Sequence, residues 1–107
     1  DLDIAFADGT TDSEFLSVIS EQIPRLIEQQ KPDFIFYLSV VDILSTDKLG
    51  KLACTLEVWK TRDSIVFENC EKRQIPVQVS MGGGYSPEIK TIIEAHANTY
   101  RIAKDIF

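Results

Sequence analysis

The chain has 107 residues, with 17 Asp and Glu against 11 Lys and Arg, so its formal net charge is −6 and its isoelectric point lies near 4.6. This length accommodates one small domain with a modest core. The acidic balance and the lack of any basic patch in the sequence argue against non-specific binding to nucleic acid or to an anionic membrane. No apolar run reaches the roughly 18 residues that span a bilayer, and no signal peptide opens the chain, so we expect a soluble, cytoplasmic protein.

The first helix is predicted to begin after Thr10, Thr11 or Asp12, any of which can cap it, and to run to about Gln30. Thr11 and Asp12 are residues that cap helices, and acidic side chains follow them in the first turn. Pro24 lies inside the pattern and removes one backbone donor, so a kink or a restarted helix is expected there. The sequence Lys31-Pro32-Asp33 ends the helix. One apolar stripe runs along it at spacings of three and four, formed by Phe15, Leu16, Ile19, Ile23, Leu26 and Ile27.

The stretch from Phe34 to Val41 is rich in apolar, β-branched and aromatic residues. Such a run predicts a strand of a parallel sheet that is buried on both faces. It ends at Asp42, and ligands of α/β proteins collect just beyond the carboxyl ends of strands. Asp42 is therefore a candidate functional carboxylate, with a helix cap or an ordinary loop carboxylate as the alternative. Residues 43–54 are predicted to form a long loop of a kind that is often functional.

The second half of the chain repeats the alternation of helix and strand. A second helix is predicted from about Thr55 to Arg73, a strand over residues 75–80, and a third helix that Ser86 caps and Pro87 begins. Helix–strand–helix–strand–helix indicates an α/β fold with a right-handed, parallel crossover. Two cysteines sixteen residues apart, without a second pair, are expected to be buried reduced thiols. These are Cys54 and Cys70, and the expected buried stripe of the third helix is Ile89, Ile92, Ile93, His96, Ala97, Tyr100 and Ala103.

Three glycines, Gly82, Gly83 and Gly84, stand between the second strand and Tyr85. They allow positive φ angles and let a ligand approach the backbone closely. A loop of this kind before a helix can hold an anion, but neither common nucleotide-binding glycine spacing is present. Tyr85 is expected at the same rim of the sheet as Asp42, where a phenol and a carboxylate can act as oxyanion donor and metal ligand. The alternative is a tyrosine that packs over a tight turn.

Two motifs together resemble the zinc-dependent histone deacetylase superfamily. They are Tyr37-Leu-Ser-Val-Val-Asp42-Ile-Leu-Ser-Thr-Asp47-Lys-Leu49-Gly50 and Gly82-Gly83-Gly84-Tyr85. The resemblance extends through essentially all 107 residues and is closest to the carboxyl-terminal third of a bacterial-type member. It implies the arginase–deacetylase fold, a three-layer α/β/α arrangement around a parallel sheet. Residues 1–107 are then expected to be the C-terminal part of a single catalytic domain.

The resemblance also implies a reaction. The family hydrolyses acetyl or similar acyl amides of lysine or small amines, with Zn²⁺ as cofactor and a zinc-bound water as nucleophile. Asp42 matches a zinc ligand, and Tyr85 matches the tyrosine that hydrogen-bonds the substrate carbonyl and stabilises the oxyanion. Leu49 matches a wall of the acyl-lysine channel, and Gly83 and Gly84 belong to the substrate-binding loop. The expected partner is the acetylated lysine or amine, with no nucleic acid and no membrane, and a homo-oligomer through an exposed sheet edge is possible.

Several departures from the family pattern limit what this chain does alone. The family's Asp-x-His ligands and its tandem histidines are not in the sequence, whose single histidine, His96, is predicted to be a core residue hydrogen-bonded to backbone. The chain by itself is therefore expected to be inactive and to bind no stoichiometric zinc. Val40 replaces the usual glycine two residues before Asp42 and is expected to crowd the pocket floor. The alternative function is a non-catalytic α/β binding or assembly module derived from the same fold.

Overall fold

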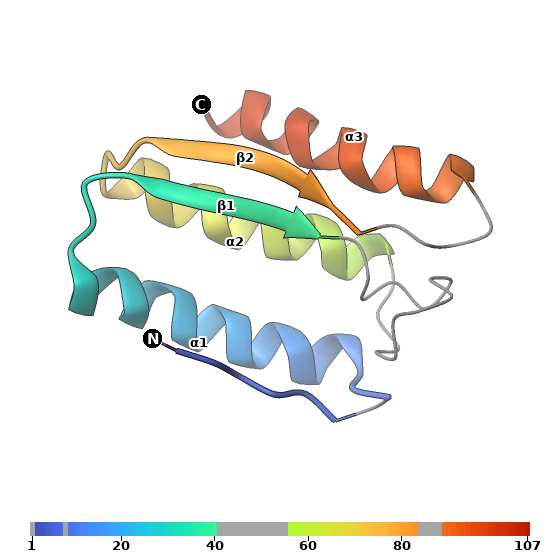
Figure 1. The fold of residues 1–107 in the computed structure, drawn as a ribbon, viewed down its shortest axis with the longest axis horizontal. Helices are drawn as coiled ribbons and strands as arrows, with labels where there is room; N and C mark the ends of the chain where they lie inside the picture. Colours follow the sequence, from blue (N-terminus) through green and yellow to red (C-terminus); the bar gives the residue numbers. More distant parts are fainter. Residues whose placement is uncertain (1, 8, 41–55, 84–88) are drawn as a thin grey trace.

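The computed structural model describes residues 2–7, 9–40, 56–83 and 89–107. Their helices and strands follow one another in the predicted order, helix–strand–helix–strand–helix (Figure 1). The two strands are parallel neighbours, which confirms the predicted α/β fold with a helix crossing between parallel strands. The elements are α1 (Asp12–Gln30), β1 (Ile35–Val40), α2 (Leu56–Lys72), β2 (Val77–Gly82) and α3 (Ile89–Ile106).

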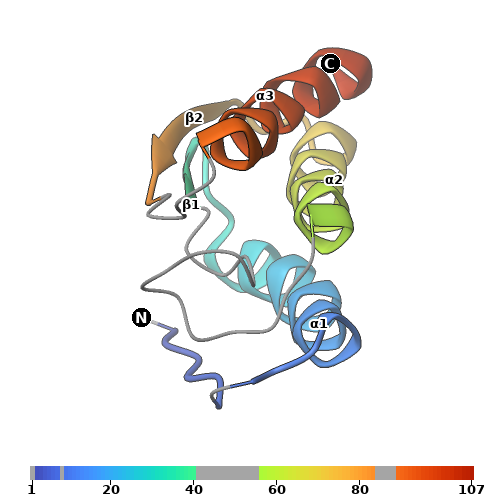
Figure 2. The ribbon, with the colours of Figure 1, turned by 90° about the vertical axis from the view of Figure 1, so that its right-hand side faces the viewer.

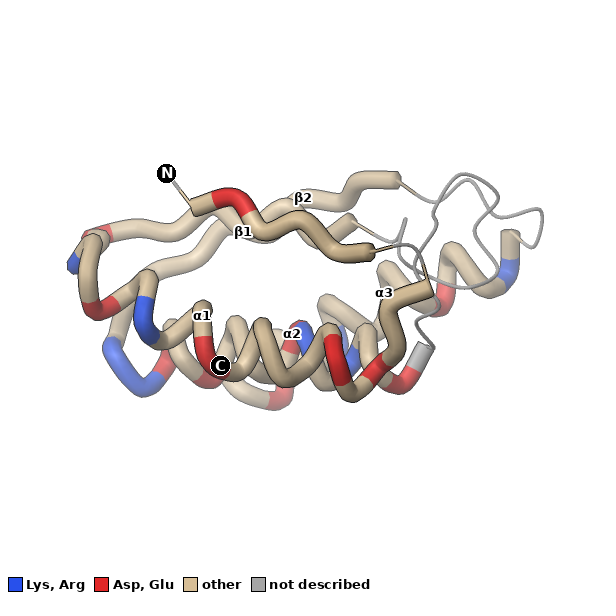
Figure 3. Tube along the Cα trace, turned by 90° about the horizontal axis from the view of Figure 1, so that it is seen from below, with Lys and Arg blue, Asp and Glu red and all other residues tan. Residues whose placement is uncertain are grey.

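The sheet has the register Ile35 opposite Val77 through Val40 opposite Gly82, so both strands end at the same edge. The strands form one layer and the three helices form a second layer beneath it (Figures 2 and 3). The N-terminal segment, residues 2–7, lies at the level of the strands (Figure 3). The described part of the chain thus covers one face of its sheet with helices.

Helix α2 is the centre of the core because it packs against both other helices. On one side Phe15 of α1 contacts Val58, and on the other side Trp59 contacts Ala95 of α3. Helix α1 runs without a restart through Pro24 and ends at Gln30, and the residue that caps it, Lys31, has a left-handed φ of 45°. The fully buried positions of α2 also include Phe67 and Cys70, the latter a free thiol as predicted, whereas Cys54 lies outside the described residues.

The sequence predicted that strand β1 is buried on both faces. This prediction is wrong for the described chain, because one face of β1 is exposed. Phe36 and Leu38 are 78% and 60% exposed, whereas Tyr37 and Ser39 point to the helices and are half-buried or buried. The reason is that α2 and α3 cover only the face that carries Tyr37 and Ser39 (Figure 3). The apolar run therefore forms a strand with apolar side chains on both faces, and the described chain covers only one of these faces.

The predicted buried stripe of α3 is right in part. Ile92, His96, Ala97 and Ala103 are half-buried, and Ile92 packs against the cluster of Trp59 and Ala95, whereas Ile89, Ile93 and Tyr100 are exposed. The buried residues of α3 are Ala95, Asn98 and Thr99. Thr99 is buried because its hydroxyl donates to the carboxylate of Asp63 on α2, and Ala95 is small enough to admit the ring of Trp59. Polar partners and small size thus decide which residues of α3 are fully buried. None of the described helices is long and apolar enough to cross a lipid bilayer.

Candidate functional site

Four of the five predicted site residues, Asp42, Leu49, Gly84 and Tyr85, lie outside the described residues. The fifth, Gly83, directly follows β2. The last residues of the two strands, Val40 and Gly82, are register partners, so the two strands end side by side, two residues before Asp42 and three residues before Tyr85 in the sequence. This is the arrangement that a shared site at one rim requires, and the site itself stays a prediction.

The glycines at the end of β2 are needed by the backbone. A Cβ at Gly82 would lie 2.9 Å from Cγ1 of Val40 and 3.2 Å from Cδ1 of Leu38, so a side chain there forces these neighbouring side chains to move. Gly83 has a φ of 69°, in the left-handed region that other residues rarely adopt. The bare backbone of Gly82 makes room for Val40, which also packs against the cluster of Trp59 and Ala95. Val40, which stands where the resembled family usually has a glycine, is therefore accommodated between Gly82 and this cluster.

A buried polar cluster lies beneath the carboxyl end of β1. Its centre is Asp63 of α2, whose carboxylate has no exposed surface. Oδ1 accepts from the phenol of Tyr37, and from Nε and Nη2 of Arg62 at 2.9 and 2.5 Å, and Oδ2 accepts from the hydroxyl of Thr99 at 2.5 Å. Ser39 completes the group through its hydroxyl contact with Thr99 at 3.2 Å. We refer to Tyr37, Ser39, Arg62, Asp63 and Thr99 as the Asp63 cluster, which joins β1, α2 and α3.

The guanidinium of Arg62 extends this cluster to the last two residues of β1. Nη1 donates to the carbonyl oxygen of Val40 at 2.8 Å, and Nη2 donates to Oγ of Ser39 at 2.6 Å. The guanidinium carbon lies 3.4 Å from the centroid of the Trp59 ring, so the charge is also stacked on an aromatic face. Arg62 is only 6% exposed, and a charge this buried has to be paired and hydrogen-bonded.

The pKa is shifted in one member of the cluster, Tyr37, and in the neighbouring His96. Burial, together with the negative charge of Asp63, raises the pKa of Tyr37 far above its usual value although Arg62 opposes the shift. Its phenol therefore stays protonated and acts as a hydrogen-bond donor. Burial and the charge of Arg62 lower the pKa of His96, so its imidazole is neutral at pH 7. His96 is half-buried, and within the described chain its Nδ1 has no hydrogen-bond partner, contrary to the predicted backbone bond.

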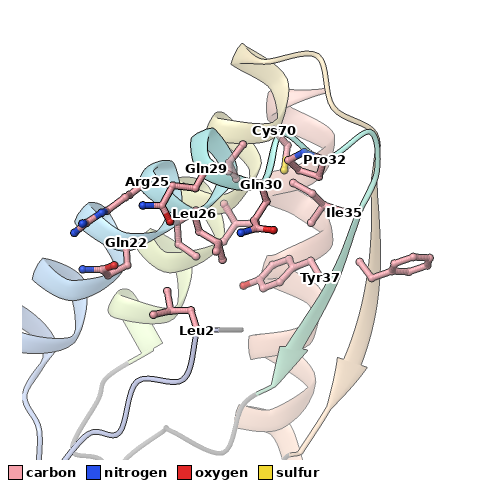
Figure 4. A pocket seen from close by; sticks show the side chains of 14 residues that line it. Leu2, Gln22, Arg25, Leu26, Gln29, Gln30, Pro32, Ile35, Tyr37 and Cys70 are labelled. Carbon is pink, nitrogen blue, oxygen red and sulfur yellow. The ribbon is translucent and has the colours of Figure 1, made fainter.

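The most prominent hollow among the described residues is elsewhere, between α1 and β1 (Figure 4). It measures about 740 Å³ and is lined mainly by apolar side chains, with Leu26 on one side and Ile35 on the other. Leu2 of the N-terminal segment closes it from below, and Tyr37 reaches into it (Figure 4). Across the described ranges, no group of three or more His, Cys, Asp or Glu side chains is placed to hold a metal ion. The hollow thus offers apolar surface rather than reactive groups.

A sequence model of the histone deacetylase domain matches residues 1–100 of this chain. The chain belongs to the histone deacetylase family. Among curated proteins, an uncharacterized protein from Picosynechococcus sp. is 34% identical over all 107 residues, which make up 36% of that protein. Histone deacetylase 2 from Arabidopsis thaliana is 29% identical over 85 residues, 79% of this chain and 22% of the plant protein. The chain thus spans about a third or less of the length of these two relatives.

The Asp63 cluster of this histone deacetylase family member was not predicted from its sequence. The sequence does contain a sign of this cluster, because five residues of α2 recur at the spacing of a single helical face. They are Trp59, Arg62, Asp63, Val66 and Phe67. Two adjacent opposite charges on the otherwise apolar face of a helix indicate a buried ion pair. The partners Tyr37 and Thr99 lie 26 and 36 residues away in sequence, which no local pattern reveals.

Proposed function

We propose that this chain is the C-terminal part of the catalytic domain of a zinc-dependent deacetylase, which hydrolyses acetyl or similar acyl amides of lysine or small amines. The observation that carries the proposal is the match of residues 1–100 to the histone deacetylase domain. The shared edge at which β1 and β2 end supports it, since ligand sites of parallel α/β sheets lie at this edge.

Asp42 is the zinc ligand that this chain contributes. A carboxylate oxygen is a suitable zinc donor, and catalytic zinc sites have about three protein ligands, so the remaining ligands belong to other parts of the parent protein. Zinc, when bound, lowers the pKa of a water molecule and polarises the amide carbonyl. The chain's contribution is to hold one carboxylate at the strand end and to present the substrate-facing residues around it.

Tyr85 donates a hydrogen bond to the carbonyl oxygen of the substrate. A fixed donor at this oxygen stabilises the charge that develops during amide hydrolysis by about 3 kcal/mol. Leu49 lines the channel for the acyl-amine chain, and Gly83 and Gly84 keep the adjacent backbone free of side chains. The left-handed φ of Gly83 is consistent with a turn that lets the backbone approach a ligand.

The test uses the complete parent protein. Acetate release is measured from an acetyl-lysine peptide and from an N-acetylated diamine, first in the purified protein, then after chelation, and then after zinc is added back. We expect turnover of at least one substrate, its loss on chelation and its return with zinc. Failure to hydrolyse either substrate with zinc bound would instead favour the alternative, a non-catalytic binding or assembly module of the same fold.

A further inference from the structure

We propose that Arg62 is a positioning residue for the metal site, because it fixes the carboxyl end of β1 from which Asp42 follows. The inference rests on the proposed function, since it gives Arg62 a role only if Asp42 binds zinc. It concerns a side chain of α2 that the predicted site did not include.

Arg62 makes hydrogen bonds beyond those that its ion pair requires. A buried Arg–Asp pair is complete with the two contacts from Nε and Nη2 to Asp63. Arg62 makes two more, at 2.8 Å to the carbonyl oxygen of Val40 and at 2.6 Å to Oγ of Ser39. Both go to the last two residues of β1, in addition to the bond that Tyr37, earlier in the same strand, donates to Asp63. The contacts are thus concentrated at the end of β1.

The guanidinium of Arg62 is itself held from two sides. Its carbon lies 3.4 Å from the centroid of the Trp59 ring, and Asp63 accepts its hydrogen bonds. Tyr37 of β1 and Thr99 of α3 both donate hydrogen bonds to Asp63 of α2. The end of β1 is therefore connected to α2 and, through Asp63, to α3. The planar fork of arginine makes these bonds in fixed directions, whereas the ammonium of lysine is a point charge on a flexible stem. Lysine at this position would keep the charge beside Asp63 and lose the fork.

Asp42 follows Val40 by only two residues in the sequence. Two residues span at most about 7 Å when fully extended, so a shift of Val40 is transmitted to the carboxylate. Metal sites are sensitive to such shifts, and substitution of residues that orient a ligand typically weakens metal binding or activity by about 10- to 100-fold. A residue that holds the strand end therefore acts on zinc affinity through Asp42 and never touches the metal or the substrate.

The experiment compares Arg62→Lys with Arg73→Lys in the complete parent protein. Arg73 is a matched control, because it directly follows the last residue of the same helix and also makes polar side-chain bonds, to Glu28 at 3.0 Å and to Asn69 at 2.7 Å. We expect Arg62→Lys to weaken zinc binding at least about tenfold and to lower kcat while KM stays within about twofold. Hydrogen exchange in metal-free protein should be faster at the end of β1. Arg73→Lys should match the wild type in all of these measurements.

Ser39→Ala is a second variant, because it removes one of the two strand-end contacts and leaves the ion pair intact. We expect it to weaken zinc binding about threefold, less than Arg62→Lys, and it decides the matter if Arg62→Lys does not fold. Unchanged zinc affinity and kcat in folded Arg62→Lys would overturn the inference, as would lower thermal stability alone. If the wild-type parent neither binds zinc nor hydrolyses an amide, the proposed function fails instead, and exchange at the strand end still shows whether Arg62 holds it.

Discussion

His96 shows how the setting of one side chain determines its charge. It is the single histidine of the chain and lies half-buried on α3, near the guanidinium of Arg62. Burial and this positive charge both disfavour the imidazolium, although Asp63 partly opposes them, and the pKa is lowered. A neutral imidazole with a lowered pKa is a group that makes the folded state sensitive to acid.

We expect the folded chain to lose stability as the pH falls below about 6.5, the ordinary pKa of an unfolded-state histidine. The unfolded chain takes up a proton there that the folded chain resists, so acid favours unfolding until His96 is protonated in both states. Proton NMR should give a titration midpoint for His96 below 6.5. The pH dependence of urea unfolding should be weaker in His96→Gln. A midpoint at or above the ordinary value would contradict this prediction.

Tyr85 is the residue on which the chemistry of the proposed site depends most directly. In the complete parent, Tyr85→Phe should lower kcat by roughly 10²–10³ and leave the zinc content unchanged, since one hydrogen-bond donor to the oxyanion is lost. Steady-state deacetylation and metal analysis measure the two quantities. Tyr100→Phe, an exposed tyrosine of α3, is the control and should behave as the wild type. Equal turnover by Tyr85→Phe and wild type would remove Tyr85 from the mechanism.

The helices and strands themselves follow from local patterns, and the sequence predicted each of them in order. Helix α1 begins and ends where the apolar stripe, the acidic first turn and Pro32 indicated. Strand β2 begins at Val77, two residues later than predicted, because Pro76 has no amide hydrogen and only its carbonyl oxygen pairs, with the amide of Ile35 at 2.9 Å. Local chemistry fixes an element and approximately its ends.

The orientation of the elements could not be predicted, because it depends on contacts between segments distant in sequence. The buried face of α3 is decided by Thr99 and its bond to Asp63, and the exposed face of β1 by which helices lie beneath it. The proposed site has the same limit. Its residues were proposed from motifs, whereas the side chain that holds the strand end, Arg62, emerged only when β1 and α2 were placed together.

The Asp63 cluster links three elements, so its loss should affect the whole fold. We expect Asp63→Asn to lower the free energy of unfolding by about 3–5 kcal/mol, because Arg62 is left buried without its counter-ion. Urea unfolding measures the change. Glu94→Gln is the matched control, since Glu94 pairs with Arg101 at 2.8 Å on the surface, where such pairs contribute about 1 kcal/mol or less. Similar losses of unfolding free energy in the two variants would show that the buried pair stabilises the fold no more than the surface pair does.

At the scale of the whole molecule, the described chain leaves part of its sheet uncovered. Phe36 and Leu38 are exposed on the outer face of β1, and among the described residues β1 has one strand neighbour, β2. Its other edge borders the apolar hollow beside α1 (Figure 4). Exposed apolar surface next to an unpaired strand edge favours association with another chain. Since the relatives are about three or more times longer than this chain, we expect the remainder of the parent to cover this surface.

The 107-residue chain on its own should therefore self-associate, bind no stoichiometric zinc and hydrolyse no acetyl-lysine. The single proposed ligand, Asp42, is fewer than the roughly three that a catalytic zinc site needs. Light scattering, zinc titration calorimetry and an acetate-release assay on the purified chain measure the three properties. Replacing Phe36 and Leu38 together by lysine should reduce self-association, because it places charge on the exposed strand face, whereas a paired replacement of the exposed Glu57 and Lys60 by alanine should not. A clean monomer that binds one zinc ion tightly would contradict this prediction and would show that the chain holds a complete set of metal ligands.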